Sequence, residues 1–487
     1  MLRKLLDSPW TYFGLAGLLA VLAVASQFEI RLPARDVGAV ADLPKLRERD
    51  DTSVLFILVD TLRADRLGAY GYARPTSPVI DRLAASGIRF AQVEAQSTWT
   101  KASMASLWTS LYPVHTGVTR FDHALPPEAV LPAERLKQAG FKTGGFFRNG
   151  WVANNFGFDQ GFDAYYQPVP TRKPDQVRRR SPGTAALQGT DLDATEAALE
   201  FLRSYGNERF FAYVHYMDVH QYLFDQEAAD LGFGTGLSDA YDAAIHWTDR
   251  NVGRLVDELE QRGLAEKTIV VIAADHGESF YEHGHEGHAT TLYGEVTGVP
   301  LIISLPFRLE EGVVVQPLVR NVDVWPTLYD LLGLPPLEAS DGRSLVPLVE
   351  AAARGETDGE TPPAFAYLDT TWGRANLPPQ PLVSVRLGSE RFLFPSTVPE
   401  LAELFDHLDD PKEQVNLSKE LPERVTELRV IAEEHLKGPV VWGEAKEVEI
   451  DEIRLGQLRA LGYVLDDAHE LKRPVPGEPE PPKKPKP

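Results

Sequence analysis

The residue types that could do chemistry begin with Thr100, in a hydroxyl-rich stretch that runs from Ser97 into a helical pattern. That pattern covers Ala102 to Ser110, so Thr100 falls at or just before a helix N-terminus. Unpaired backbone N–H groups and the helix dipole favour an anion at such a position. A threonine hydroxyl is a poor nucleophile unless a metal ion binds its oxygen and lowers its pKa. Thr100 is therefore a candidate nucleophile if the chain also supplies metal ligands.

Residues that can bind a metal ion follow three buried-strand patterns. Residues 54–59, 210–215 and 268–274 are apolar runs, typical of parallel strands covered on both faces. At or beyond their carboxyl ends lie Asp60, Asp218, His220, Asp275 and His276. Ligands of open α/β sheets bind at this edge, and carboxylates, imidazole and a hydroxyl oxygen suit a divalent cation. One such aspartate is more often a turn or cap residue, but the convergence of several favours a metal site.

A glycine-rich stretch after the third strand, DHGESFYEHGHEGH, holds His276, His283, His285 and His288. For His283 and His285, a solvated loop or an adventitious metal tract explains the pattern equally well. His288 stands just before the next predicted helix and strand, which returns it to the sheet edge. We therefore expect His288, like His220, to contact the substrate or donate a proton.

Further candidates lie near these residues. Lys101 and Arg148 are cations that could hold an anionic substrate group, although each type is more often a surface charge. Asn149 and Asp218 complete the candidate substrate-binding set. Four other histidines are interpreted as structural or solvated: His115, His123, His246 and His407.

The remaining patterns predict an α/β sheet domain followed by a smaller α+β unit. Helices are predicted from Pro78, with Ser77 as its cap, and over residues 239–262 and 322–332, with a further strand over 299–304. From residue 364 the texture changes to short β-like runs and then to a charged helix over 422–437.

Composition excludes some classes of function. The chain has 487 residues and a net charge of −22, so it lacks the basic surface that binding to nucleic acid requires. It has no cysteine, which excludes disulfides and thiolate metal sites.

The two ends of the chain differ from the middle. Arg3 and Lys4 precede an apolar run from Ser8 to about Gln27, which predicts a membrane anchor over residues 1–30, favoured over a signal cleaved after 23–25. A polar linker is expected over 31–51, and the catalytic part should lie outside the cytoplasm, periplasmic or at the cell surface. Residues 441–487 are predicted to be an extension with a disordered Pro/Lys tail.

Six blocks of sequence point to a known family. They are VDTLRADRLGAYGY, TWTKASMASLWTSLYP, AADHGESFYEHG, LYGEVTGVPLII, DVWPTLYDLLGLPP with DGRSLVPL, and LFDHLDDPKEQVNLS. In this order they resemble the sulfatase family of the alkaline phosphatase superfamily, from Val54 to about Leu436. The resemblance implies an alkaline-phosphatase-like α/β/α sandwich with a large mixed sheet over 52–363. A small C-terminal α+β subdomain over 364–440 completes this fold.

Carried over position by position, the resemblance implies roles for individual residues. Asp60, Thr100, Asp275 and His276 resemble the ligands of one divalent metal ion (Ca, Mn, Zn or Mg), with Thr100 also the nucleophile. His220 and His288 match positions that contact the transferred group or its leaving oxygen. The family's doubled aspartate is reduced here to Asp60-Thr61, and Lys101 lies at a variable position of the signature.

The departures from the family bear on the reaction. Sulfatases have cysteine or serine where this chain has Thr100, followed by proline and arginine where it has Ala102 and Met104, and they modify it to formylglycine. With no cysteine in the chain, no formylglycine is expected. The formylglycine hydrate expels sulfate by elimination, whereas an unmodified alcohol requires water to attack the central atom of the covalent adduct. This suits phosphorus better than sulfur.

These patterns predict a metal-dependent ester hydrolase, exported and tethered to the membrane, that acts on an anionic phosphate ester in preference to a sulfate ester. Two alternatives remain. One is a membrane-anchored transferase of the phosphoethanolamine or phosphoglycerol type, and the other is a catalytically silent binding protein with the same fold.

Overall fold

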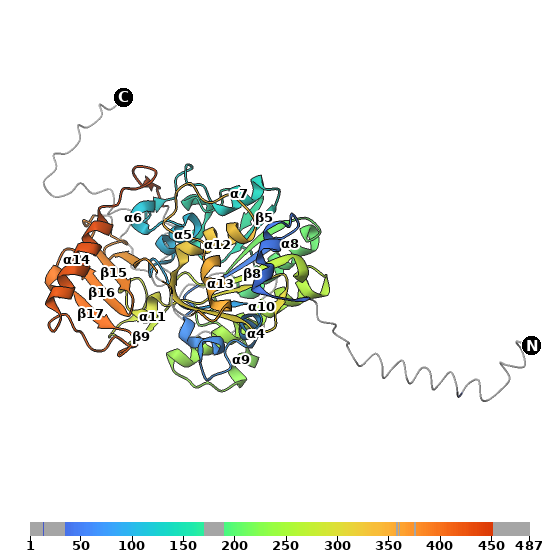
Figure 1. The fold of residues 1–487 in the computed structure, drawn as a ribbon, viewed down its shortest axis with the longest axis horizontal. Coiled ribbons are helices and arrows are strands. Elements are labelled where there is room, and N and C mark those ends of the chain that lie inside the picture. Colours follow the sequence, from blue (N-terminus) through green and yellow to red (C-terminus); the bar gives the residue numbers. More distant parts are fainter. Residues whose placement is uncertain are drawn as a thin grey trace, which may run out of the picture.

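The computed structural model describes Phe13 and residues 35–169, 189–356, 359, 361–374 and 376–450. Its centre is an eight-stranded sheet in the order β13-β3-β11-β8-β2-β7-β5-β6 (Figure 1). The strands are β2 (Ser53–Val59), β3 (Ile88–Glu94), β5 (Lys142–Phe147), β6 (Ala164–Tyr166), β7 (Phe210–Tyr216), β8 (Thr268–Ala273), β11 (Leu301–Ser304) and β13 (Val313–Arg320). β11 runs antiparallel to its neighbours β3 and β8, and the other pairs are parallel, so the sheet is mixed as predicted.

Helices cover both faces of the sheet. α4 (Pro78–Ala85), α8 (Asp191–Tyr205) and α10 (Leu237–Gln261) pack together on one face. α5 (Thr100–Thr109), α12 (Val324–Leu331) and α13 (Val346–Ala353) cover the other. Side chains of β7 alternate between the layers: the Tyr213 ring contacts Trp108 of α5, whereas the Tyr216 hydroxyl lies 2.7 Å from that of Thr195 in α8. Burial on both faces explains why the central strands are continuous apolar runs.

The predicted strands and helices are present, with one difference at a helix start. The first amides of α4 are capped by Asp249 of α10, whose carboxylate accepts hydrogen bonds from Val79 N and Ile80 N at 2.9 and 2.8 Å. The hydroxyl of Ser77, the predicted cap, instead donates to Asp81. Tertiary packing has therefore replaced the local cap.

A second, antiparallel sheet follows the main domain and occupies one end of the molecule (orange and red in Figure 1). It consists of β14 (Ala364–Asp369), β15 (Pro381–Leu387), β16 (Glu390–Pro395) and β17 (Glu403–Asp406), with α14 (Pro422–Leu436) packed on β15 and β16. We refer to residues 364–436 as the C-terminal unit. Its α+β architecture agrees with the predicted fold class.

The linker predicted over 31–51 differs from the structure in its described part. β1 (Val37–Gly38) pairs with β12 (Arg308–Leu309), and α3 (Leu43–Arg47) packs on α12. The segment packs against the domain because Leu43 and Leu46 are buried. In the predicted C-terminal extension, β18 (Lys446–Glu447) pairs with β4 (His123–Ala124).

The predicted anchor or signal and the Pro/Lys tail lie outside the described residues, apart from Phe13. Within the described part of the chain, we find no helix with the length and hydropathy needed to cross a bilayer.

Candidate active site

Four adjacent parallel strands, β5, β7, β2 and β8, end at the same edge of the sheet. Their carboxyl ends supply the candidate residues Asn149, His215, His220, Asp60, Asp275 and His276. Thr100, the first residue of α5, meets them there: its Oγ1 lies 3.2 Å from His276 Nε2 and accepts a hydrogen bond from Asn149 Nδ2 at 3.3 Å. The structure thus places the predicted nucleophile beside the predicted metal ligands.

Asp60 and Asp275 hold two carboxylates close together in a fully buried position. Asp60 Oδ2 accepts hydrogen bonds from Asn149 Nδ2 at 2.6 Å and from His215 Nε2 at 3.0 Å. Asp275 Oδ1 accepts from the backbone N–H groups of Thr61 and His276, at 3.2 and 3.0 Å. The other two oxygens, Asp60 Oδ1 and Asp275 Oδ2, are buried without a hydrogen-bond partner among the described residues. Such orphaned oxygens are costly unless a cation binds them.

His276 presents its free ring nitrogen to the same place. Its Nδ1 lies 3.0 Å from the carbonyl oxygen of Gly277, which can only accept, so Nδ1 carries the hydrogen. Nε2 therefore keeps its lone pair, near Thr100 Oγ1 and 3.3 Å from Asp275 Oδ2. Ligand atoms of Asp60, Asp275 and His276 all lie within 4.8 Å of one another. Two carboxylates, one imidazole and one hydroxyl fit a divalent cation.

The electrostatics of the two carboxylates differ. Burial raises the pKa of Asp60, but the hydrogen bond from His215 and the imidazoles of His220 and His276 outweigh burial and hold that pKa below its usual range. Burial, and then the charge of Asp60, raise the pKa of Asp275 to about 7. Burial lowers the pKa of His276, which favours the neutral, ligand-competent ring. The two carboxylates, Asp60 and Asp275, therefore repel each other, and a bound cation would reduce this repulsion.

The backbone after Asp60 is strained. Thr61 has a φ of 60°, in the left-handed region that residues with a branched side chain rarely adopt. This conformation points its N–H at Asp275, and the Tyr241 hydroxyl holds its carbonyl at 2.6 Å. Thr61, where the family has its second aspartate, thus orients a ligand candidate through its backbone.

Two further histidines lie beside the nucleophile. The ring of His288 lies with its centroid 4.5 Å from that of His276 and 4.9 Å from that of His220. His288 Nδ1 lies 3.0 Å from Glu278 Oε1. Burial lowers the pKa of His288 to about 4, and burial raises the pKa of Glu278 to about 7. The structure thus places both predicted substrate-contacting histidines at the site, with a carboxyl group behind His288.

The structure gives Arg148 and Asp218 a different environment from the predicted one. Arg148 is fully buried, and its guanidinium donates to Asp218 Oδ1 at 3.2 Å and to the Gly189 carbonyl at 2.6 Å. Asp218 Oδ2 accepts from Asp191 N and from Trp247 Nε1, each at 2.8 Å. These partners compensate both charges inside the protein, which favours a structural role over the predicted contact with substrate.

Lys101 is also oriented differently from the prediction. Its ammonium group donates to the carbonyl oxygens of Phe121 and His123 and lies 3.9 Å from the Phe156 ring centroid. Burial lowers its pKa well below the usual range. The ammonium group is thus surrounded by aromatic rings and carbonyl oxygens of the protein. This geometry does not support Lys101 as a contact of the transferred group.

Two residues at the site were not predicted from the sequence. His215 donates to Asp60, and its other nitrogen accepts from the Tyr213 hydroxyl at 2.6 Å. Glu278 belongs to the same DHGE block as Asp275 and His276. The sequence did hold a signal for His215. This residue stands at the end of the buried strand that precedes His220, and a polar side chain at that strand end is a candidate for the site.

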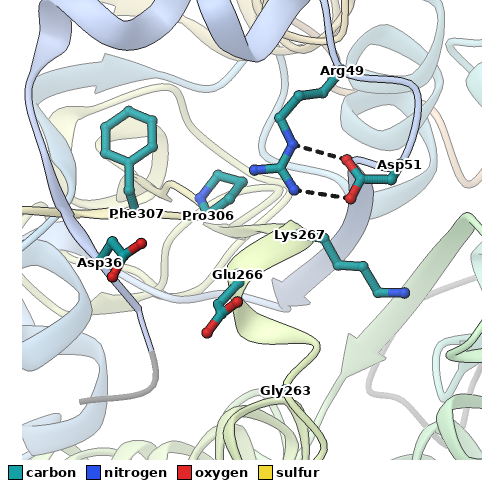
Figure 2. A pocket seen from close by; sticks show the side chains of 8 residues that line it. All are labelled: Asp36, Arg49, Asp51, Gly263, Glu266, Lys267, Pro306 and Phe307. Carbon is teal, nitrogen blue, oxygen red and sulfur yellow. Dashed lines mark hydrogen bonds and ion pairs between the residues drawn. The ribbon is translucent and has the colours of Figure 1, made fainter.

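A hollow of about 260 Å³ lies elsewhere, at the amino ends of β2 and β8 (Figure 2). Its lining includes Asp36, Asp51, Glu266 and Lys267, and Arg49 pairs with Asp51 on one side of it. It offers no histidine and no buried unpaired carboxylate oxygen, so the chemistry described above belongs to the opposite edge of the sheet.

Comparisons with known proteins identify the family of this chain. The family model described as Sulfatase matches residues 52–334, and the model of the N-sulphoglucosamine sulphohydrolase C-terminal region matches residues 282–437. An arylsulfatase of Hemicentrotus pulcherrimus is 26% identical over 345 residues, which cover 60% of this chain and 61% of that protein. An N-acetylgalactosamine-6-O-sulfatase of Bacteroides thetaiotaomicron is 23% identical over 78% of this chain and 92% of that protein.

Among solved structures, a phosphonate monoester hydrolase of Agrobacterium radiobacter superposes with a TM-score of 0.62 at 21% identity, covering 79% of this chain and 95% of that chain. This likeness shows the fold. The class of protein is defined by two features. They are an α/β/α sandwich with a C-terminal α+β unit, and a buried cluster of carboxylates and histidines at the strand ends. The chain belongs to the sulfatase family.

Proposed function

We propose that this protein is a metal-dependent ester hydrolase in which the unmodified hydroxyl of Thr100 is the nucleophile, and that a phosphate ester is the preferred substrate. One observation carries the proposal. Thr100 Oγ1 lies 3.2 Å from His276 Nε2, next to buried carboxylate oxygens of Asp60 and Asp275 that have no hydrogen-bond partner among the described residues.

One divalent ion would be held by Asp60, Asp275, His276 and Thr100. When bound, it would neutralise the two carboxylates, polarise the ester and lower the pKa of the threonine hydroxyl. His215 and Asn149 hold Asp60 Oδ2 on its other side, so the carboxylate is oriented before an ion arrives. The side chains present therefore fit the ion that the family implies.

The residues of the chain divide the remaining work. The Thr100 hydroxyl gives up its proton to solvent, and its oxygen forms a bond to phosphorus as the bond to the leaving oxygen breaks. His288 Nε2 supplies the proton that the leaving oxygen needs, because a proton shared between His288 and Glu278 leaves Nε2 as a donor. His220, whose ring lies beside that of His288, would hold a non-bridging oxygen, while Asn149 keeps Asp60 and Thr100 in place. Water then gives a proton to His288 Nε2 and attacks phosphorus, and the phosphate group leaves as the oxygen of Thr100 takes up a proton.

The preference for phosphorus follows from the nucleophile. The sequence has no cysteine, and an ordinary alcohol cannot expel the group by elimination as formylglycine can. Hydrolysis of the threonine adduct needs attack at the central atom, which favours phosphorus. The names of the relatives cover both chemistries, with an arylsulfatase on one side and a phosphonate monoester hydrolase on the other.

A transferase that uses a membrane lipid as acceptor is a weaker candidate. Arg35, which precedes β1, donates to Ser304 Oγ and to the Leu305 carbonyl at 2.6 and 2.9 Å, near the amino end of β8. This is the edge of the sheet opposite Thr100. With the membrane anchor that the sequence predicts before Arg35, the site would face away from the bilayer. We therefore favour an extracytoplasmic enzyme that acts on a soluble ester.

The test is a panel of p-nitrophenyl sulfate, phosphate monoester, phosphodiester and phosphonate ester, offered to the full chain loaded with Mn²⁺, Zn²⁺ or Ca²⁺. We expect phosphoryl or phosphonyl esters to be hydrolysed faster than the sulfate, and Thr100→Ala to lose this activity. Thr109→Ala is the matched control, because Thr109 lies at the other end of α5 and its hydroxyl bonds only to the Ala105 carbonyl among the described partners. Full turnover by Thr100→Ala would disprove the nucleophile, and faster sulfate hydrolysis would disprove the preference.

A further inference from the structure

Glu413, in the loop between β17 and α14, connects three parts of the molecule. Its carboxylate bonds to Arg391 Nε of β16 at 2.5 Å and to Gly294 N at the start of α11 (Gly294–Thr297) at 2.8 Å, and it pairs with His407 at 2.6 Å. Its carbonyl oxygen lies 3.0 Å from His283 Nε2. Glu413 adopts a φ of 55°, a left-handed conformation that costs energy for a residue with a side chain. The strain is tolerated because the residue makes all these contacts at once.

His283, which the sequence left as a solvated or adventitious histidine, is enclosed at this junction. Its Nδ1 lies 2.8 Å from Glu295 Oε1, and its Nε2 lies 3.0 Å from the Glu413 carbonyl. Both neighbours can only accept while Glu295 is ionised, so both ring nitrogens carry hydrogen and the ring is an imidazolium. The Gln414 amide nitrogen, 3.3 Å from the same Nε2, already donates to the Lys412 carbonyl. The His283 ring also stacks on Tyr293, with centroids 3.8 Å apart and planes 8° apart.

These contacts lead directly to the catalytic loop. α11, held by Glu413 at its first amide, accepts a hydrogen bond from Gly277 N at the Val296 carbonyl (2.9 Å). A Cβ on Gly277 would lie only 2.2 Å from the Glu295 carbonyl oxygen, so loop and helix are in close contact. Gly277 follows His276, and the loop then supplies Glu278 and His288. The junction therefore fixes the loop both at Gly277 and at His283.

We propose that His283 is a positioning residue whose imidazolium fastens the loop of His276, Glu278 and His288 to Glu413 of the C-terminal unit. The inference rests on the proposed function, because it assigns the C-terminal unit a part in placing that function's proton donor. It also explains the DPKEQVNL block, which includes Glu413 and otherwise has no role at the site. When His283 loses its proton, one of its two bonds is lost and the loop is held only at α11.

The acceptor groups that face His283 favour its charged form. On its own loop, Glu282 pairs with Arg63. Glu295 faces the ring from α11, and Tyr293 covers it while donating to Glu403 of β17. From the C-terminal unit the ring meets Glu413, whose charge is shared with Arg391 and His407, and Gln414. Burial lowers the pKa of His283, but the Glu295 carboxylate and the Glu413 carbonyl outweigh burial and raise the pKa to about 9.

The sign of the effect follows from this raised pKa. The stabilisation by the imidazolium is complete below the pKa of a free histidine and is lost as the pH rises through about 9. We therefore expect kcat of the wild type on bis(p-nitrophenyl) phosphate to fall on the alkaline side of that pH. His283→Gln should lack this step and should show a kcat about tenfold lower near neutral pH with a similar KM. Glu295→Gln should move the step to lower pH by at least about one unit, because it removes the carboxylate that raises the pKa.

His285→Gln is the matched control, because the His285 side chain is exposed on the same loop. It should leave both kcat and the pH profile unchanged. An unchanged kcat and profile in His283→Gln, or an equal effect of His285→Gln, would overturn the proposal. A purely structural contact would lower the melting temperature of His283→Gln without moving the alkaline step in Glu295→Gln.

A measurement without turnover separates this proposal from the proposed function. With ¹⁵N-labelled histidine in the full chain, the signals absent from His283→Gln report on His283. Near neutral pH they should show two protonated ring nitrogens, and a neutral ring would overturn the proposal even if the enzyme is active. Conversely, a charged ring in a chain that hydrolyses no ester would leave the positioning contact intact and refute the proposed function.

Discussion

Two buried clusters of charge in this molecule are built in opposite ways. At the join between the large sheet and the C-terminal unit, Arg391 bonds to Glu94 of β3 at 2.6 Å and to Glu413 at 2.5 Å, and all three side chains are almost fully buried. At the strand ends, Asp60 and Asp275 are equally buried, but each keeps one oxygen without a hydrogen-bond partner among the described residues. Arg386 also faces Glu94 at 3.7 Å, so the two carboxylates of the first cluster are balanced by two arginines, whereas the second cluster has excess negative charge.

The difference shows that burial of a charge does not by itself mark a functional site. Arg148 illustrates the point, because it lies near the catalytic strands but its charge is compensated by Asp218 and Asp191. What distinguishes the candidate active site is negative charge without a protein cation to balance it. A bound divalent cation would supply that balance.

The largest effect should come from removing one carboxylate of the incomplete cluster. Asp60→Asn should lower turnover of the best ester of the panel about 10³-fold or more, because the ion loses a charged ligand and Thr100 its activation. Asp249→Asn is the control, since Asp249 is as buried but, among the described residues, its carboxylate accepts hydrogen bonds only from the Val79 and Ile80 amides of α4. It should keep its activity. Comparable turnover by Asp60→Asn and the wild type would show that the two clusters do not differ in function.

The complete cluster should respond in stability. Arg391→Met removes the buried cation that bonds directly to both Glu94 and Glu413, so the free energy of unfolding should fall by about 3–5 kcal/mol. Arg424→Met breaks a half-exposed pair with Glu390 and should cost less than about 1 kcal/mol. Urea unfolding of both variants at one pH gives the comparison. Equal losses would mean that burial adds nothing to the Arg391 pairs.

The sequence could predict the strands and helices that supply the site. It could not predict which side chains, distant in the sequence, pair with one another in the fold. Asp60, Asp275 and Thr100 could be predicted as candidates because each follows a strand or starts a helix, and local sequence patterns reveal such positions. Arg148, Lys101 and Asp218 carried the right charge, but their partners are brought to them by tertiary packing. Similarly, nothing near His283 in the sequence indicates Glu413, which lies 130 residues away. Charge compensation is a property of the fold, so the sequence alone cannot separate a structural cation from a substrate contact.

Metal binding should distinguish the two clusters by an intermediate change in the free energy of unfolding. At a free ion concentration about 100 times its dissociation constant, the ion should stabilise the native state by about 2.7 kcal/mol. This gain should vanish with EDTA and in Asp275→Asn but persist in Arg391→Met, because only the strand-end cluster binds the ion. Thermal unfolding with Mn²⁺, Zn²⁺ or Ca²⁺ measures it. A gain that persists in Asp275→Asn would place the ion elsewhere.

The smallest effect is the change in stability with each unit of pH, where the two clusters should respond with opposite sign. Burial raises the pKa of Glu413, but Arg391 and His407 outweigh burial and lower the pKa to about 2. The contribution of Glu413 to stability is therefore present above the pKa of a free glutamate and is lost as the pH falls towards 2. Burial and Asp60 raise the pKa of Asp275 to about 7, so without an ion the native state retains a proton that the unfolded chain releases. Its contribution therefore decreases as the pH rises from about 4 to 7, by at most about 1.4 kcal/mol per pH unit. Unfolding free energies should be measured in EDTA between about pH 2 and pH 7. The value for Glu413→Gln should approach that of the wild type as the pH falls below about 4, and the value for Asp275→Asn should approach it as the pH rises from about 4 to 7. Parallel curves would show that the strand-end carboxylates are balanced by the protein itself, which would remove the physical reason for a cation at Thr100.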